Sequence, residues 1–231
     1  MKILYIVGNW KSNKTIGEAT LWWESFVRLT NKDNQLGSMS KSGKVNIVLC
    51  APFTVLPYLK SKVMESGVAI SLGAQDVSPF PEGAYTGEVN ARMVKELADY
   101  VIIGHSERRR YFKETDEELE FETLQASSAE LSTIYCIEGQ ENRIPASVTI
   151  AAYEPPAAIG GGQAEDVGKA GAVCNLIREK TKKPVLYGGS VTPRNVAEFF
   201  KHPAIDGVLL GGASLDPEKF YAVIQKATET S

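Results

Sequence analysis

The sequence predicts an α/β protein that folds as one parallel (β/α)8 barrel domain over residues 1–231. Short apolar segments alternate with longer segments of helical periodicity, which is the pattern of βα units around a parallel sheet. The apolar segments are nearly continuous in Val, Ile and Leu, as expected of strands that are covered on both faces. The chain of 231 residues also has the length of one barrel, which is about 200–250 residues.

Each element can be assigned in chain order from these patterns. The expected strands are Ile3–Gly8, Val45–Cys50, Val68–Gly73, Tyr100–Gly104, Thr133–Ile137, Val148–Tyr153, Val185–Tyr187 and Gly207–Leu210. The expected helices are Ile16–Leu29, Thr54–Glu65, Ala91–Leu97, Asp116–Ala129, Glu165–Lys180, Pro193–Lys201 and Pro217–Thr228. The last two helices carry start signals, because Thr192 and Asp216 each place a capping side chain before a proline at the first helical position.

Two connections are irregular. About ten residues, 137–146, join the fifth strand to the sixth, with Gly139 and Pro145 among them and no helical period. A parallel crossover normally takes about a dozen residues or more, so the fifth helix is expected to be shortened or missing. The polar segment Lys32–Lys44 is rich in Gly and Ser and is expected to be a mobile loop.

The composition excludes several classes of protein. A net charge of −3 gives no general attraction to nucleic acid or to an anionic membrane. No run approaches the ~18–20 apolar residues of a membrane span, and the first apolar run is too short for a signal peptide. Cys50, Cys136 and Cys174 lie far apart without metal-binding spacing. They predict neither a disulfide framework nor a zinc site, and they favour a cytoplasmic location.

The residues that follow the strands predict an acid–base site, because α/β barrels place their chemistry where strands end. Asn9 and Lys11 follow the first strand, and His105 follows the fourth. Glu154 closes the apolar sixth strand, where partial desolvation is expected to raise its pKa and make it a stronger base. Taken singly, these residues have ordinary alternatives: a solvated loop lysine, a structural histidine and a capping glutamate. Taken together, a base, neutral donors and one cation suit proton transfer next to a carbonyl group, through an enediolate.

Glycines near the last strands predict a phosphate site. The segments YGGSV (187–191) and LLGGASL (209–215) follow the seventh and eighth strands, and a third glycine run occupies 160–162. Glycine allows backbone N–H groups to approach an anion closely, and barrels often bind phosphate in the loops after strands seven and eight. One such pair alone is more often a tight turn. The small residues between Glu154 and the third glycine run suit a lid, and neither a dinucleotide fingerprint nor a P-loop is present.

Seven motifs occur in the order of one known family. They are GNWKSN (8–13), GAQDVSPFPEGAYTGEV (73–89), YVIIGHSERR (100–109), AYEP (152–155), AIGGG (158–162), YGGSV and GVLLGGASL (207–215). Over nearly its whole length the chain resembles the triosephosphate isomerase family. The resemblance implies a TIM barrel that interconverts dihydroxyacetone phosphate and D-glyceraldehyde 3-phosphate in glycolysis and gluconeogenesis, without metal or organic cofactor. A glutamate base with a neutral histidine under a closing lid is a standard example of catalysis taken from this family.

The resemblance also implies a role for particular residues. Glu154 matches the base, His105 the electrophile, and Asn9 with Lys11 the substrate-binding pair. The positions that match phosphate-contacting or supporting residues are Gly160, Ser190, Gly211, Gly212, Ser106 and Glu107.

The resemblance further implies self-association, because family members are homodimers or larger. The segment Ala84–Gly87 lies where the family inserts its third loop into a neighbouring subunit, so Thr86 is expected to approach Lys11 of that subunit. A tetramer is left open. The chain departs from the common pattern at Ser12, at Ala157, at the lid hinge Gln163–Glu165 and at CIEG (136–139). Pro155-Pro156 and the short 137–146 segment resemble archaeal members, whereas the remaining motifs are bacterial-like.

Two alternative functions are compatible with parts of the same pattern. Another sugar-phosphate isomerase of the phosphoribosyl type would need a second phosphate site, and the sequence shows none. An inactive or altered sugar-phosphate-binding barrel is disfavoured because Asn9, Lys11, His105 and Glu154 are all retained.

Overall fold

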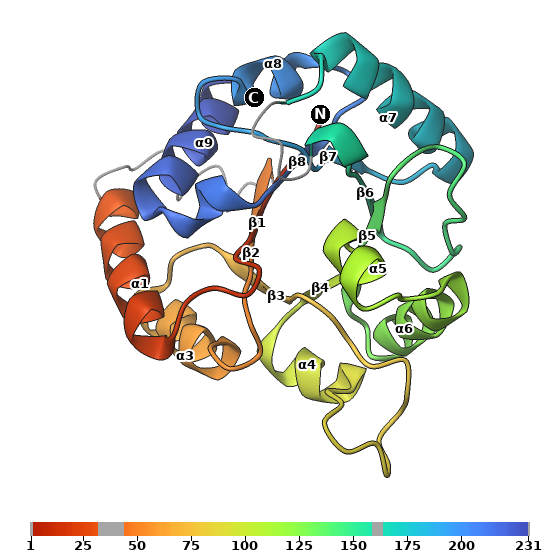
Figure 1. Cartoon of the computed structure of the whole chain (residues 1–231). Coiled ribbons are helices and arrows are strands. Elements are labelled where there is room, and N and C mark those ends of the chain that lie inside the picture. The colour runs from red at the N-terminus through yellow and green to blue at the C-terminus, as the bar shows by residue number, and fades with distance from the viewer. Residues whose placement is uncertain (1, 32–43, 159–163, 231) are drawn as a thin grey trace.

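The computed structural model describes residues 2–31, 44–158 and 164–230. Within these residues eight parallel strands pair in chain order, and β1 pairs with both β2 and β8, so the sheet closes into a barrel (Figure 1). The strands are β1 (Leu4–Asn9), β2 (Val45–Cys50), β3 (Ser71–Ala74), β4 (Tyr100–Ile103), β5 (Ser132–Ile137), β6 (Ile150–Tyr153), β7 (Val185–Tyr187) and β8 (Gly207–Leu210). The predicted fold class and the eight predicted strands are confirmed.

Helices form a ring outside the strands (Figure 1). They are α1 (Ile16–Thr30), α3 (Leu56–Ser66), α4 (Ala91–Leu97), α5 (Ser106–Tyr111), α6 (Asp116–Ser128), α7 (Val167–Thr181), α8 (Val196–Lys201) and α9 (Pro217–Thr230), with 3-10 turns η1 (Pro156–Ala158) and η2 (Gly212–Leu215). The start of α9 is confirmed, since Asp216 accepts the N–H groups of Glu218 and Lys219. None of the described helices is long and apolar enough to cross a membrane.

Two helix predictions were wrong. Helix α8 begins at Val196, because Thr192 to Asn195 form a separate turn in which the Asn195 side chain accepts the Thr192 N–H. Pro193 therefore lies in that turn and not in the helix. Helix α5 was missed, because its six residues, SERRRY, are too short and too charged to show an apolar period.

The connection between β5 and β6 lacks a helix. Residues 138–149 are all described and contain only turns and extended backbone. The Asn142 side chain accepts the N–H groups of Glu138 and Gly139 and so closes a tight loop directly after β5. The expected loss of the fifth helix is confirmed, whereas residues 32–43 of the expected mobile loop lie outside the described residues.

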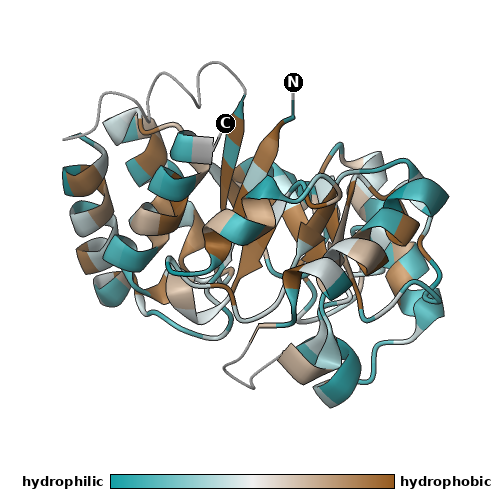
Figure 2. Ribbon diagram, turned by 90° about the horizontal axis from the view of Figure 1, so that it is seen from above, coloured by the Kyte–Doolittle hydropathy of each residue, from teal (hydrophilic) through white to brown (hydrophobic). Residues whose placement is uncertain are grey.

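Both faces of the strands are buried. In β1, Ile6 belongs to the cluster between strands and helices, while its neighbour Val7 belongs to the cluster inside the barrel. Figure 2 shows the same division, with the hydrophobic colour on the strands and on the helix faces turned towards them. Because the strands are parallel, all their carboxyl ends open at one end of the barrel, where the predicted site residues meet.

Candidate active site

The end of β1 carries Asn9 and Lys11. Lys11 has φ of 53°, a left-handed conformation that non-glycine residues rarely adopt. The Asn9 side-chain oxygen accepts the Lys11 N–H at 2.9 Å. Gln75, which follows β3, donates to the same oxygen at 3.2 Å and to the Lys11 carbonyl at 3.0 Å. These bonds stabilise a strained backbone that directs both side chains to the barrel mouth.

The Lys11 ammonium is paired with a carboxylate on α5. Its Nζ donates to Glu107 Oε1, and both side chains are about one-third exposed. On the opposite side, a Cβ added at Gly211 would lie 3.3 Å from Lys11 Cε. Because Gly211 has no side chain, the Lys11 side chain can pack directly against the loop after β8.

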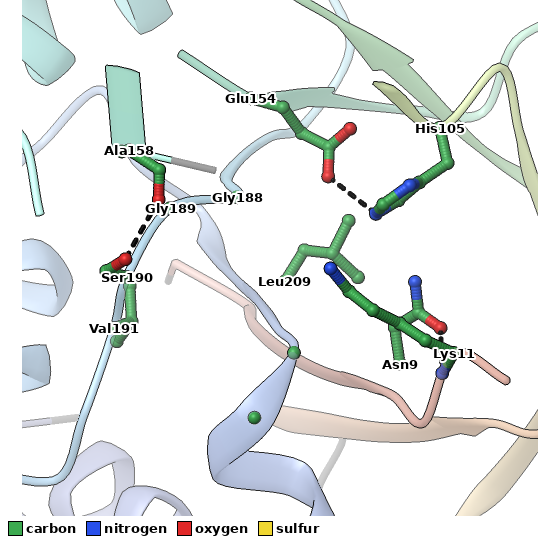
Figure 3. Close-up of a pocket in the computed structure, with 12 residues that line it drawn as sticks. Asn9, Lys11, His105, Glu154, Ala158, Gly188, Gly189, Ser190, Val191 and Leu209 are labelled. Carbon is green, nitrogen blue, oxygen red and sulfur yellow. Dashed lines mark hydrogen bonds and ion pairs between the residues drawn. The ribbon is translucent and has the colours of Figure 1, made fainter. Parts of the chain in front are cut away.

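His105 is buried at the start of α5, where it is the N-cap residue. Its Nδ1 accepts the Glu107 N–H at 3.2 Å, as a capping side chain does at a helix N-terminus. In a neutral ring the proton then resides on Nε2. That Nε2 lies 3.0 Å from Glu154 Oε1, so the donor edge of the imidazole faces the carboxylate (Figure 3).

Glu154 follows β6 and is almost fully buried. Its Oε2 accepts the Ser106 N–H at 3.0 Å, and its Oε1 faces His105. Burial raises the pKa of Glu154, but the hydrogen bonds from His105 and Ser106 outweigh it, so this pKa lies below its ordinary value. The sequence-based expectation of a raised pKa was wrong for this conformation, because it could not include donors supplied by α5.

The glycine loops after β7 and β8 line the same mouth, and the first of them begins at Gly188, next to Glu154. Ser190 donates its hydroxyl to the Ala158 carbonyl at 2.8 Å, which joins the loop after β7 to the segment after β6 (Figure 3). Gly211 and Gly212 open the 3-10 turn η2, whose first N–H groups have no partner within the turn. Gly160 and Gln163, and with them most of the expected lid, lie outside the described residues.

One cavity collects these groups. It has a volume of about 290 Å³, which suits a small ligand. Figure 3 shows side chains from β1, β4 and β6 on one side and the glycine loops on the other. The predicted residues that line it are Asn9, Lys11, His105, Glu154, Ser190, Gly211 and Gly212. The structure brings together a carboxylate, a neutral donor, a cation and backbone N–H groups, which is a set able to move a proton and hold an anion.

Sequence reasoning missed Gln75 as a residue that positions the site. It donates to Asn9, to Lys11 and to the Cys50 carbonyl, so it ties the ends of β1, β2 and β3 together. The signal was available, because Gln75 is the first polar side chain after β3, at the same sheet edge as the other site residues. Leu209 on β8 also lines the cavity and gives it an apolar floor.

The expected subunit-contact loop stands apart from this cavity. Residues 81–88 are exposed, Thr86 among them, and Figure 1 shows the yellow segment between β3 and α4 projecting from the barrel. Within the segment the rings of Phe80 and Tyr85 stack with centroids 4.4 Å apart.

Ala157, one of the residues that depart from the common family pattern, is exposed in the 3-10 turn η1 after β6.

Comparison with known proteins gives consistent matches. The profile of one family, described as triosephosphate isomerase, matches residues 4–151 and 142–227. The triosephosphate isomerase of Synechococcus sp. (strain JA-2-3B'a(2-13)) is 38% identical over 251 residues, covering 97% of this chain and 97% of that protein. The triosephosphate isomerase of Endomicrobium trichonymphae is 36% identical, covering 95% of this chain and 97% of that protein. The triosephosphate isomerase of Mesomycoplasma hyopneumoniae (strain 232) is also 36% identical, with the same coverage.

Proposed function

The chain belongs to the triosephosphate isomerase family and interconverts triose phosphates, and from that premise we propose that Glu154 is the base that moves the proton. The single observation that supports this role is the approach of the Glu154 carboxylate to His105 Nε2 in a cavity that Lys11 also lines. The two substrates of the family differ only in which of two neighbouring carbons carries the carbonyl group. One carboxylate that reaches both carbons is therefore sufficient to remove the proton from one carbon and return it to the other.

In the proposed reaction, Glu154 removes a proton from the hydroxymethyl carbon beside the ketone of dihydroxyacetone phosphate. The C–H electron pair forms the C=C bond of an enediolate, and the ketone oxygen takes the negative charge. A proton then passes from one enediolate oxygen to the other, and Glu154 returns its own proton to the former carbonyl carbon. The product is the aldehyde, D-glyceraldehyde 3-phosphate, and the base is regenerated.

His105, Asn9 and Lys11 are proposed to stabilise the enediolate. His105 directs a neutral N–H donor into the cavity because its other ring nitrogen accepts from the start of α5. The Lys11 ammonium supplies a positive field, and its ion pair with Glu107 orients it. Donors that are already oriented do not need to reorganise as the charge develops.

Backbone N–H groups after β7 and β8 are proposed to bind the phosphate dianion, at Ser190, Gly211 and Gly212. Gly211 and Gly212 line the cavity at the start of a 3-10 turn, and the first N–H groups of a helical turn are a common anion-binding arrangement. Gly160 is proposed to add to this set from the other side. Anchoring the phosphate places the reacting carbons between Glu154 and His105.

Glu154 must exchange its present hydrogen bonds before it acts. The Ser106 N–H holds one oxygen and His105 faces the other, which keeps the pKa of the carboxylate low. When substrate displaces these partners and water is excluded, desolvation is left as the main effect and the base becomes stronger.

The assembly is proposed to be a homodimer in the cytoplasm, with the whole chain acting as one domain. A groove beside the cavity is lined by Lys11, Gln75 and Phe112, and the exposed 81–88 segment of a second copy is proposed to occupy it, with Thr86 near Lys11. Light scattering is expected to give twice the chain mass, and a monomer would contradict this contact. Buried, free cysteines suit a reducing compartment.

Substitution Glu154→Gln tests the proposed base. The amide has the same shape but cannot accept the proton, so kcat is expected to fall by about 10²–10⁴-fold with little change in KM. Isomerisation of D-glyceraldehyde 3-phosphate measures kcat, and inhibition by a phosphorylated two-carbon carboxylate reports the phosphate site. Glu138→Gln removes an exposed charge beyond β5 and serves as the matched control. Wild-type turnover by the Glu154→Gln variant would refute the assignment.

A further inference from the structure

Three carboxylates meet outside the active-site cavity, two of them partly buried and the third, Glu122, buried. Asp76 follows β3, Glu114 precedes α6, and Glu122 lies within α6. One ligand atom from each lies within 4.8 Å of those of the other two. We refer to Asp76, Glu114 and Glu122 as the acidic cluster.

Arg108 satisfies only part of the acidic cluster. Its Nη2 lies 2.7 Å from Asp76 Oδ2, and its Nε donates to Glu114 Oε1. Among the described residues, Arg108 is the one cation within ion-pair distance of these three carboxylates. If all three are ionised, three negative charges face one positive charge, which leaves a net charge of −2 in a partly buried place.

Three oxygens of the acidic cluster have no hydrogen-bond partner among the described residues. They are Asp76 Oδ1, Glu114 Oε2 and Glu122 Oε2, and all three atoms are buried. Glu122 is the most buried of the three, since the residue is only 3% exposed and contributes to the acidic cluster from the buried side of α6. A buried carboxylate oxygen without a donor is costly, so something is expected to balance it.

We propose that Asp76, Glu114 and Glu122 bind a hard divalent cation, Ca²⁺ or Mg²⁺. Carboxylate oxygens are the ligands both ions prefer, and a dication cancels the residual charge of −2. Two oxygens on opposite sides of Ca²⁺ are about 4.6–5.2 Å apart, so ligand atoms within 4.8 Å of one another can share one Ca²⁺, with water completing its shell. Around Mg²⁺ two such oxygens are at most about 4.2 Å apart, so Mg²⁺ requires the three carboxylates to lie closer together than that limit.

The charged groups around the acidic cluster agree with this proposal. Burial and repulsion by neighbouring carboxylates raise the pKa of Asp76 to about 7 and of Glu122 to about 9, although Arg108 opposes both shifts. Burial also raises the pKa of Glu114, which Arg108 and Arg109 oppose and Glu118 assists. A bound dication would replace the protons that such a site otherwise retains.

The cation has a structural role in this proposal, because it ties the loop after β3 to α6. Asp76 directly follows Gln75, which holds Asn9 and Lys11. Binding is therefore expected to stabilise the fold without participating in proton transfer.

The test uses the full chain after treatment with EDTA and transfer to metal-free buffer. CaCl2 and MgCl2 are added separately, with NaCl matched for ionic strength, while Tm and the heat of binding are measured. One saturable site is expected, with a rise in Tm of about 5–10 °C when the ion is at 100 times its Kd. The ion that gives the larger shift at equal concentration is the one the site prefers.

Two variants locate the binding. Glu122→Gln keeps the shape of the side chain but removes a charged ligand, so it is expected to weaken binding at least about tenfold and to raise the Tm of the metal-free protein. Glu117→Gln removes an exposed charge from the same helix and is expected to respond to the ion as the wild type does. Asp76→Asn provides a second variant from a different element, with the same expected loss of binding.

Two results would overturn the proposal. The first is no saturable effect of either ion up to about 10 mM, ten times the Kd of weak natural calcium sites. If Glu122→Gln still raised the metal-free Tm in that case, the acidic cluster would hold protons in place of a cation. The second is an equal ion-induced shift in wild type and Glu122→Gln, which would assign binding to another surface. These readouts need no substrate, so they are independent of the proposed role of Glu154.

Discussion

Glu154 and Glu122 are two buried carboxylates with opposite electrostatic behaviour. They are 2% and 3% exposed, so burial penalises their charged forms to a similar degree. Glu154 accepts hydrogen bonds from Ser106 and His105, and its pKa is lowered despite burial. Glu122 faces two other carboxylates, and burial and their charge raise its pKa to about 9. The difference shows that the donors aimed at a buried carboxylate, and not its depth, determine whether it is ionised at neutral pH.

Gly188→Ala tests whether catalysis depends on the tight packing of the backbone against the Glu154 side chain. A Cβ at Gly188 would lie 2.9 Å from Glu154 Cγ, so the carboxylate must move. We expect kcat/KM to fall by about 10–100-fold, because displacement of a reacting group by about 1 Å can already cost about 100-fold. The control Gly17→Ala adds a methyl group in α1 where no atom lies within 4 Å. Equal kcat/KM in the wild type and Gly188→Ala would show that the site tolerates such movement.

Ser106→Pro removes one of the donors that distinguish Glu154 from Glu122. Ser106 is the first residue of α5, a position that accepts proline, and His105 has the extended conformation that proline requires before it. Loss of the N–H is expected to raise the pKa of Glu154, so the acid limb of kcat/KM should move up by about 1–2 pH units. Ser106→Ala keeps the N–H and should shift less. An unchanged acid limb in Ser106→Pro would contradict the role assigned to this bond.

The pH dependence of stability tests whether the pKa of Glu122, unlike that of Glu154, is raised in the folded protein. Its pKa in the folded protein is raised, so the folded state holds more protons than the unfolded state and the unfolding free energy decreases as pH rises towards about 9. In metal-free buffer, the fall in Tm between pH 6 and 9 is expected to be about 3–8 °C smaller in Glu122→Gln than in wild type. Glu117→Gln should follow the wild type. Parallel curves for wild type and Glu122→Gln would mean that Glu122 does not titrate in this range.

The fold could be predicted because strand positions in a parallel barrel depend on local apolar character. The prediction was weakest where tertiary contacts set the boundary. Residues 68–70 read as a strand, but β3 begins only at Ser71, where pairing with Val48 of β2 starts. The start of α8 was predicted too early for a related reason, since the Asn195 side chain accepts the Thr192 N–H and forms a turn before the helix.

The candidate site could be predicted because the end of each strand marks the mouth of the barrel. That rule located Asn9, Lys11, His105 and Glu154 without knowledge of their contacts. It could not give the pKa of Glu154, which depends on donors 48 and 49 residues away in the chain. The acidic cluster could not be predicted either, because only the packing of the loop after β3 against α6 brings its three members together. In the sequence they cannot be distinguished from ordinary surface acids.

The closure of the barrel between β1 and β8 has a consequence for synthesis on the ribosome. Asn9 and Lys11 emerge first, but β1 finds its second neighbour only after Gly207–Leu210 has been made. The indole N–H groups of Trp10 and Trp22 both donate to the Ser214 carbonyl, so these two hydrogen bonds also form only after residue 214 has been made. A nascent chain therefore has an unpaired β1 edge until translation is almost complete, and such an edge can pair with another chain before the barrel closes.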